Sequence, residues 1–268
     1  MKVAISPCPN DTLAFSSLIQ KGGLDLSLHD IETLNSIARS SQVFDITKLS
    51  VACLPYVLDD YIVLPVGAAF AEKGGPKLIA KGCASVVDLL SNPLAIPGKN
   101  TSAYCAFCML YGVPKYPVEM KYEEVIPAVK TGGCCGGIVI HEGRCACKSR
   151  NVREIANLGI EYRKRFSHLL PLGVIVAKRS LPQIRGFSLQ LQSSIQEGRL
   201  ADSIPEYVLA HAPSSSLESI QEHIKAYVTE ETEMMSSGAR DAICFFLEEG
   251  VRSGTLSPLK RSDIVASI

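Results

Sequence analysis

The sequence contains no tryptophan and no long apolar run. None of its 268 residues is tryptophan, and no stretch of about 18 uninterrupted apolar residues occurs, which is roughly the length that a membrane-spanning helix needs. The apolar run at the N-terminus is short, and Pro7 interrupts it, so it lacks the features of a secretory signal. We therefore expect a cytoplasmic protein with no membrane partner.

An excess of charge of either sign is also missing. The chain has 27 basic and 27 acidic residues, and its formal net charge is zero. Proteins that bind nucleic acids usually carry a basic surface, because the summed field of that surface attracts the phosphates. We therefore expect a small-molecule partner and no nucleic acid, whereas composition does not indicate an oligomeric state.

Four short motifs that bind cofactors or carry catalysis are absent as well. The sequence has no GxGxxG after a strand, no GxxxxGK[ST], no HExxH and no GxSxG. The run Gly-Gly-Cys-Cys-Gly-Gly at residues 132–137 is rich in glycine, but it precedes a predicted strand. It therefore lacks the helix N-terminus that binds phosphate, and we expect no nucleotide cofactor.

Cysteine, in contrast, is plentiful. The chain has ten cysteines, which we expect to be reduced thiols in a protein of this length that is not exported. Cys105 and Cys108, together with Cys134-Cys135 or with Cys145 and Cys147, offer four thiolates to zinc. We favour packing over metal, because Cys105 and Cys108 fall in an apolar helical pattern. A nucleophilic role for Cys8 at a helix start is a further alternative.

Short runs rich in Val and Ile alternate with helical patterns, and this alternation predicts an α/β fold. We predict strands at residues 3–5, 24–28, 62–66, 78–80, 94–96, 138–140 and 174–177. Helices are predicted at residues 12–21, 102–110, 123–130, 217–228 and 238–249. Turn-rich residues 81–92 and the sequence Pro171-Leu172-Gly173 are the expected crossings between two lobes. We predict one lobe from residues 1–84 and 173–268, and an inserted lobe from residues 85–172.

Two segments share a design in which a strand runs through a proline turn into a polar helix start. They are Ser-Pro-Cys-Pro-Asn-Asp-Thr at residues 6–12 and Pro-Gly-Lys-Asn-Thr-Ser at residues 97–102. The first N–H groups of a helix lack internal partners and face the positive end of its dipole, so such a start favours an anion such as a carboxylate. The alternative is that Asn10 or Asp11 and Thr101 only cap their own helices.

His141 and Glu142 follow the apolar run at residues 136–140. Catalytic groups of open α/β sheets gather at the carboxyl ends of strands, and a histidine there is suited to act as a general base near neutral pH. The alternative is a histidine that only makes a structural hydrogen bond. His211 and His223 lie in helical C-terminal sequence, and we interpret both as structural.

Several of these segments occur together, in one order, in a known enzyme family. They are residues 6–12, residues 44–50, Pro55-Tyr56-Val57, residues 97–101, residues 140–144, Pro171-Leu172-Gly173, His211-Ala212, and His223-Ile224 with Tyr227-Val228. With them the chain resembles the 1,4-dihydroxy-6-naphthoate synthase family of the futalosine route to menaquinone. The resemblance covers most of the chain.

This resemblance implies a two-lobed fold like that of type II periplasmic binding proteins, with a central cleft and no metal or organic cofactor. It implies a lyase that converts cyclic dehypoxanthine futalosine, an aromatic carboxylate, to 1,4-dihydroxy-6-naphthoate and dihydroxyacetone. His141 would be the general base. The substrate-binding residues expected from the two helix starts and the family motifs are Asn10, Asp11, Thr12, Asn35, Ser50, Thr101 and Ser102.

The sequence also departs from the family. Residues 145–150, Cys-Ala-Cys-Lys-Ser-Arg, lack the aromatic character usual there, and the tryptophan-containing stretch that usually follows is missing. A changed substrate is consistent with this difference. The main alternative function is a non-catalytic cytoplasmic protein of the same fold that binds a small carboxylate, because fold does not determine function. A zinc-stapled regulatory protein is a third interpretation.

Overall fold

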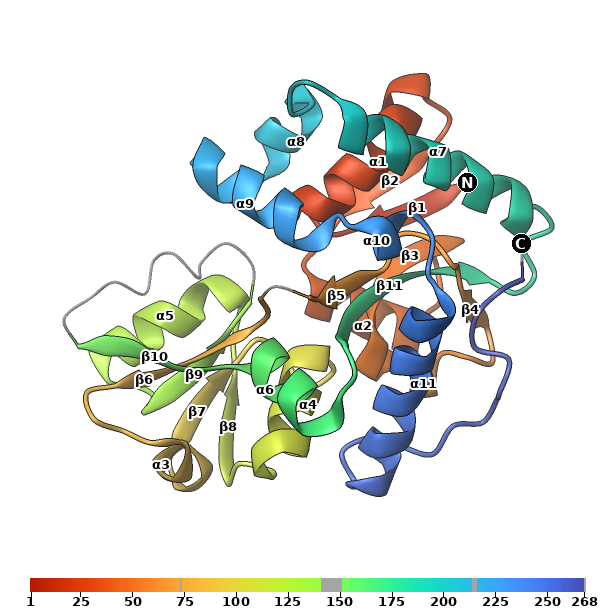
Figure 1. Ribbon diagram of the computed structural model, residues 1–268. Coiled ribbons are helices and arrows are strands. Elements are labelled where there is room, and N and C mark those ends of the chain that lie inside the picture. Colours follow the sequence, from red (N-terminus) through yellow and green to blue (C-terminus); the bar gives the residue numbers. More distant parts are fainter. Residues whose placement is uncertain (73, 141–150, 214–215, 268) are drawn as a thin grey trace.

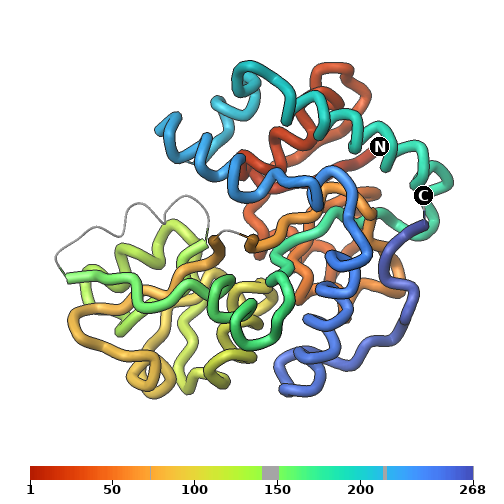
Figure 2. The backbone as a smooth tube through the Cα atoms, viewed as in Figure 1, coloured from red at the N-terminus to blue at the C-terminus, as the bar shows by residue number. Residues whose placement is uncertain are grey.

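The computed structural model describes residues 1–72, 74–140, 151–213 and 216–267. The chain forms two α/β lobes, each built on its own sheet, and it passes from the first lobe to the second and back again (Figure 1). The tube view shows the N-terminal and C-terminal segments together in the first lobe, with the middle of the chain forming the second (Figure 2). The α/β class with two lobes is therefore confirmed.

The first sheet has the strand order β2-β1-β3-β11-β4, and β5 also pairs with β11. β1 is parallel to β2 and β3, whereas β11 is antiparallel to β3, β4 and β5. Its strands are β1 (Lys2–Ile5), β2 (Asp25–Leu28), β3 (Ile46–Ser50), β4 (Tyr61–Val63), β5 (Ala69–Ala71) and β11 (Leu170–Lys178). The carboxyl ends of β1 and β3 therefore lie at one edge of this sheet, which is where α/β proteins place their ligands.

Helices pack on both faces of the first sheet (Figure 1). One face carries α1 and α7, whose rings Phe15 and Phe187 lie 6.3 Å apart; the other is covered by α11, which packs against β11. The bounds are α1 (Pro9–Lys21), α2 (Ile31–Ser40), the 3-10 helix η1 (Val51–Tyr56), α7 (Ile184–Leu200), α8 (Glu206–His211), α9 (Leu217–Tyr227), α10 (Glu230–Glu233) and α11 (Ser237–Arg252).

The second sheet has the order β10-β6-β9-β7-β8. Its strands are β6 (Lys77–Lys81), β7 (Pro93–Ile96), β8 (Tyr116–Glu119), β9 (Gly136–Val139) and β10 (Val152–Asn157). Its helices are α3 (Val86–Ser91), α4 (Ser102–Tyr111), α5 (Tyr122–Thr131) and α6 (Leu158–Phe166). A buried core that includes Leu78, Phe107, Val176 and Phe246 runs from this lobe into the first, so apolar packing holds the two lobes together.

The glycine-rich run before β9 has a packing role. A Cβ atom on Gly137 would lie 2.6 Å from Val125 Cγ1 of α5, and one on Gly136 would lie 2.5 Å from the Ile79 carbonyl of β6. Only glycine therefore allows α5 and β6 to approach β9 this closely.

The sheets divide the chain earlier than the predicted lobe boundary at residue 84. β6 was assigned to the first lobe, but it pairs with β9 and β10 in the second sheet. On the return, β11 already joins the first sheet at Leu170, before the predicted boundary at residue 172. The turn signals after β6 mark a turn within the second lobe, since Gly82 and Ala84 lie between β6 and α3. We therefore propose crossings just before β6 and at the start of β11.

All seven predicted strands and all five predicted helices overlap observed elements, with ends that differ by a few residues. The strands β3, β5, β8 and β10 were not predicted. Over the described residues, no helix is both long enough and apolar enough to span a membrane.

Candidate active site in the cleft between the lobes

A cleft with an empty volume of about 630 Å³, its open mouth included, lies between the two lobes. The first lobe contributes the turn after β1, the start of α1, the end of β3 and α9, and the second contributes the start of α4 and the residue after β9. The described lining residues are Ser6, Cys8, Asn10, Asp11, Ile31, Lys48, Ser50, Ala69, Pro76, Thr101, Ser102, Ala103, Ile140, Leu172, Gly173, His223 and Tyr227. The cleft therefore brings together segments from both ends and the middle of the chain.

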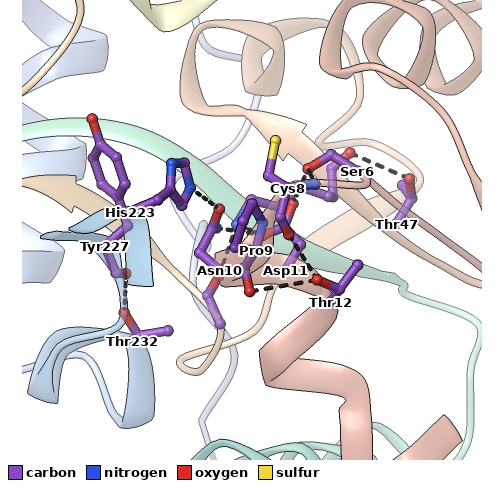
Figure 3. A network of polar contacts seen from close by, with 12 residues as sticks. Ser6, Cys8, Pro9, Asn10, Asp11, Thr12, Thr47, His223, Tyr227 and Thr232 are labelled. Carbon is purple, nitrogen blue, oxygen red and sulfur yellow. Dashed lines mark hydrogen bonds and ion pairs between the residues drawn. The ribbon is translucent and has the colours of Figure 1, made fainter. Parts of the chain in front are cut away.

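Asp11 is the centre of a buried polar network at the start of α1 (Figure 3). Its carboxylate accepts hydrogen bonds from Ser6 Oγ at 2.5 Å and from Asn10 Nδ2 at 2.7 Å. The Lys48 ammonium lies 2.7 Å from the same carboxylate. Protein donors thus contact both carboxylate oxygens of Asp11, and Asp11 itself supplies the negative charge at the start of α1. This makes the α1 start a poor place for a substrate carboxylate.

Lys48 was not singled out from the sequence, although it lies in the motif at residues 44–50. Its side chain is 5% exposed, and its ammonium also donates to the Gly67 carbonyl at 3.1 Å. Gly173 on the neighbouring strand β11 gives it room, because a Cβ atom there would lie 2.9 Å from Lys48 Cε. Among the described cleft residues, Lys48 is the only lysine or arginine. No local signal in the sequence distinguishes it from a surface lysine of an exposed strand.

His223, which the helical sequence pattern indicated as a structural residue, lies in the cleft wall. It is 2% exposed, and its Nε2 lies 2.8 Å from Asn10 Oδ1. Because Asn10 Nδ2 donates to Asp11, the amide oxygen faces the ring, and Nε2 must be the donor. The neutral ring therefore carries its lone pair on Nδ1. Tyr227, one turn further along α9, packs its ring 4.7 Å from that of His223.

His211 has a different environment from His223. It is exposed at the end of α8, its Nδ1 contacts the Tyr207 carbonyl at 2.8 Å, and its ring stacks on that of Tyr207. It does not line the cleft, which agrees with the structural role inferred from the sequence.

The start of α4 faces the α1 start across the cleft. Thr101 is the N-cap residue: its hydroxyl accepts from Tyr104 N at 3.3 Å and donates to the Gly98 carbonyl at 2.8 Å. The Ser102 hydroxyl donates to the Leu172 carbonyl at 2.7 Å and accepts from Ala52 N at 3.2 Å. Capping is therefore confirmed for Thr101, which also lines the cleft. The backbone N–H groups of Ser102 and Ala103, which precede the capped N–H of Tyr104, have no carbonyl partner within the helix, and they are the donors best suited to an anion.

The cleft unites five of the predicted substrate-binding residues, namely Asn10, Asp11, Ser50, Thr101 and Ser102. Asn35 and Thr12 lie behind its wall. Asn35 is fully buried, accepts from Ser50 N at 2.9 Å and donates to Ser50 Oγ at 3.0 Å and to the Asn100 carbonyl at 3.3 Å. Thr12 is also fully buried and donates to the Cys8 carbonyl at 3.1 Å. Both therefore position cleft residues and do not line the cleft themselves.

A contact between the lobes lies beside the cleft. The Glu32 carboxylate on α2 accepts a hydrogen bond from Asn100 Nδ2, and Arg39 donates to the Asn100 Oδ1 atom. Burial raises the pKa of Glu32 above 4.5, and the nearby negative charge of Glu119 raises it further, against hydrogen bonds that lower it. Gly98 has φ +133°, and a Cβ atom there would lie 2.4 Å from Glu32. The first lobe thus holds the loop that opens α4.

The predicted catalytic residue His141 lies outside the described residues, as does Glu142. Ile140, the residue directly before His141, lines the cleft at the end of the second sheet. The predicted strand before this segment is present, since β9 ends at Val139, whereas the place and the role of His141 stay predictions.

Cys105 and Cys108 on α4 have the properties of buried thiols. Burial raises the pKa of Cys105 to about 12 and that of Cys108 to about 11, so both are protonated at neutral pH and are poor metal ligands. No group of three His, Cys, Asp or Glu side chains in the described parts of the chain is arranged to hold a metal ion. Cys145 and Cys147 lie outside those parts. Cys8, the N-cap residue of α1, lines the cleft.

The fold is that of periplasmic binding proteins. The periplasmic aliphatic sulphonate binding protein SsuA of Escherichia coli superposes with a TM-score of 0.63 at 12% identity, over 94% of this chain and 92% of that one. A crystal structure of protein AF1704 from Archaeoglobus fulgidus superposes with a TM-score of 0.87 at 25% identity, over 95% and 98% of the two chains. The predicted fold is therefore confirmed.

Two proteins named 1,4-dihydroxy-6-naphtoate synthase are similar over nearly the whole sequence. The protein from Streptomyces coelicolor is 31% identical, with 97% of this chain and 95% of that one covered. The protein from Thermus thermophilus is 30% identical, with 97% of each covered. A family described as menaquinone biosynthesis matches residues 1–251. Because these matches extend over nearly the whole sequence, the chain belongs to this menaquinone biosynthesis family.

Proposed function

We propose that this chain is a carbon–carbon lyase that converts cyclic dehypoxanthine futalosine to 1,4-dihydroxy-6-naphthoate and dihydroxyacetone. The observation that carries the proposal is the cleft itself, in which the starts of α1 and α4 face each other over a buried polar network. The names of the two relatives support the product. A cytoplasmic location is part of the proposal, because it is where we expect a biosynthetic enzyme of this kind.

The start of α4 is the proposed site for the substrate carboxylate. Thr101, Ser102 and Ala103 line the cleft there, and backbone N–H groups in the first turn bind anions without a buried arginine. At the α1 start, the Ser6 hydroxyl and the Asn10 amide already donate to the Asp11 carboxylate, so they are not available to a substrate carboxylate. A carboxylate at α4 leaves the rest of the ring system to extend toward α1, with Ser50 and Asn10 as its polar neighbours in the wall.

His141 is the proposed general base. It follows Ile140, which lines the cleft, and an imidazole is suited to accept a proton near neutral pH. In a retro-aldol-like cleavage, the base removes a proton from a substrate hydroxyl, the carbonyl of dihydroxyacetone forms, and the carbon–carbon bond breaks. The electron pair of that bond stays with the ring system, which becomes aromatic. These steps move protons and electron pairs within the substrate, so we propose that no cofactor takes part.

The test uses purified protein, cyclic dehypoxanthine futalosine and mass spectrometry. We expect 1,4-dihydroxy-6-naphthoate and dihydroxyacetone in equal amounts from the wild type. We expect the rate of His141→Ala to be lower than that of the wild type by a factor of at least about 100, since general base catalysis typically contributes this much. His211→Ala is the matched control, because it removes an exposed imidazole that lies outside the cleft.

The outcomes separate the two candidate functions. Wild-type protein that binds the compound tightly but forms no product would contradict the lyase and favour a binding protein, the function of the structural relative SsuA. Product formation by His141→Ala at the wild-type rate would leave the lyase in place and show that another residue is the base.

A further inference from the structure

The Lys48 ammonium is a buried cation that is built into the cleft wall. Its side chain is 5% exposed, and that of its partner Asp11 is 4% exposed. Asp11 and the Gly67 carbonyl accept two of its N–H groups, and an ammonium group has three. Gly173 supplies the space above β3 in which the side chain lies. Contacts with Asp11, Gly67 and Gly173 therefore hold this charge in the cleft wall.

Stability does not account for this arrangement. Removing two charges from water costs free energy that their attraction offsets only in part, and apolar residues of similar volume often replace a buried ion pair without loss of stability. Ser6 and Asn10 also donate to the Asp11 carboxylate, so Lys48 is not its sole donor. A buried pair whose cation lines a substrate cleft has the features of an electrostatically preorganised site.

We propose that Lys48 is a catalytic residue that stabilises the negative charge developing on a ring oxygen of the substrate as the carbon–carbon bond breaks. The inference rests on the proposed lyase function and assigns a second residue to it. The base takes one proton from the substrate hydroxyl. The C–O bond becomes a carbonyl as the carbon–carbon bond breaks, and the released electron pair moves through the ring to an oxygen that accepts the third Lys48 N–H.

No net proton is gained or lost, and the protonation state of Lys48 does not change. The proton held by the base returns to the ring oxygen, directly or through water, and yields the neutral hydroxyl of the product. Lys48 stays an ammonium throughout and acts only as a charged hydrogen-bond donor. Asp11 is in turn a positioning residue, since its oxygens accept hydrogen bonds from the protein and hold Lys48 and Asn10 in place.

The first test measures the charge beside a bound ring oxygen without turnover. The probe is 5-hydroxy-2-naphthoate, a product-like compound whose phenol ionisation is visible by absorbance. A cation within hydrogen-bond distance lowers the pKa of a bound phenol by roughly 1–3 units. We expect this lowering in the wild type and its loss in Lys48→Met, while the carboxylate of the probe still binds at α4.

The second test separates chemistry from folding. Lys48→Met leaves the Asp11 carboxylate buried without its cation, so it is expected to lose stability, and the double variant Asp11→Asn/Lys48→Met is expected to regain it. If Lys48 is catalytic, the stable double variant still shows kcat lowered about 100-fold, with KM within about threefold of the wild type. If the pair is only structural, activity returns together with stability.

Lys178→Met is the matched control. Lys178 on β11 pairs with Asp45 at 3.6 Å and lies outside the cleft, so its loss is expected to leave kcat and the phenol pKa unchanged. Two results would overturn the role of Lys48 and leave the lyase in place. In both, the wild type turns over substrate, and either the double variant is equally active or the phenol pKa is the same in wild type and Lys48→Met. Wild-type protein that neither forms product nor binds the probe would overturn both the lyase and the role of Lys48.

Discussion

His223 Nε2 lies 2.8 Å from Asn10 Oδ1, although the two residues are 213 positions apart in the sequence. This contact joins α9 to the first turn of α1 (Figure 3). Through Asn10 it continues to Asp11 and then to Lys48. Four side chains from three separate segments therefore form one polar network in the cleft wall, and each of them restricts the orientation of the next.

The first prediction concerns the proton on His223. Because Asn10 presents its oxygen, Nε2 carries a proton in both the neutral and the charged ring. We expect a slowly exchanging Hε2 resonance for His223 in ¹⁵N-histidine NMR spectra, since the ring is buried and hydrogen-bonded. Asn10→Ala is expected to make that proton exchange faster. His211→Gln identifies the resonances of the exposed His211, whose exchange rate serves for comparison. A neutral ring protonated at Nδ1 alone would contradict the prediction.

The second prediction concerns the close contact between Gly98 and Glu32. Gly98→Ala places a Cβ atom 2.4 Å from the Glu32 side chain of the other lobe, whereas Gly112→Ala meets nothing within 4 Å. Both glycines have positive φ, so each alanine costs about 1–3 kcal/mol in backbone strain. We expect only Gly98→Ala also to weaken substrate binding, by about tenfold or more in a calorimetric titration. Equal affinity in the two variants would show that the contact does not shape the cleft.

The third prediction concerns the pH dependence of stability at Glu32. Burial raises the pKa of Glu32 above 4.5 in the folded protein, so the folded state binds more protons here than the unfolded state. The contribution of this group to stability is therefore lost as the pH rises through the window above 4.5. We expect Glu32→Gln, which has no charge to bury, to be more stable than the wild type above this window.

Urea unfolding at pH 4 and pH 8 measures this effect. The advantage of Glu32→Gln is expected at pH 8 and is expected to shrink toward zero at pH 4, where the wild-type carboxyl is protonated. Glu248→Gln is the control, because Glu248 is exposed in the C-terminal half of α11 and its replacement is expected to have a small effect at both pH values. A variant that is less stable at pH 8 would indicate that the charge of Glu32 holds the lobes together.

The fourth prediction concerns the thiols. Burial raises the pKa of Cys53 to about 12 and that of Cys105 to about 12, whereas Cys83 is exposed. We expect iodoacetamide at pH 8 to modify Cys83 within minutes and to leave Cys53 and Cys105 unmodified until the protein unfolds, as peptide mass spectrometry would show. Modification of Cys105 as fast as Cys83 would restore the metal-site alternative for the Cys105–Cys108 pair.

Local patterns in the sequence predict most of the elements but not all of the strands. The runs that form β1, β7 and β11 are continuous apolar segments bounded by turns, and their strands are present. β3 was not predicted, because Lys48 and Thr47 interrupt its apolar pattern. Both residues are buried all the same, since a network far away in the sequence satisfies the lysine. A pattern that treats lysine as a surface residue therefore misses the strand that carries the site.

The site was predictable only in part, because some of its residues have local sequence signatures and others are placed by tertiary packing. Helix starts have local signatures in the sequence, and Thr101 caps α4 as its pattern indicates. His223 has no such local signature, although it stands in one of the family segments, and its position in the cleft follows from the packing of α9 near α1.

The sequence by itself determined the α/β class, the two helix starts and the family, because each depends on residues that are close together along the chain. Only the tertiary structure decided that Asp11 forms an ion pair with Lys48, that Asn35 forms hydrogen bonds with Ser50, and that His223 lines the cleft. The physical reason is that buried polar groups require partners, and in this fold the partners come from segments up to 213 residues away. Their identity is set by how the lobes pack.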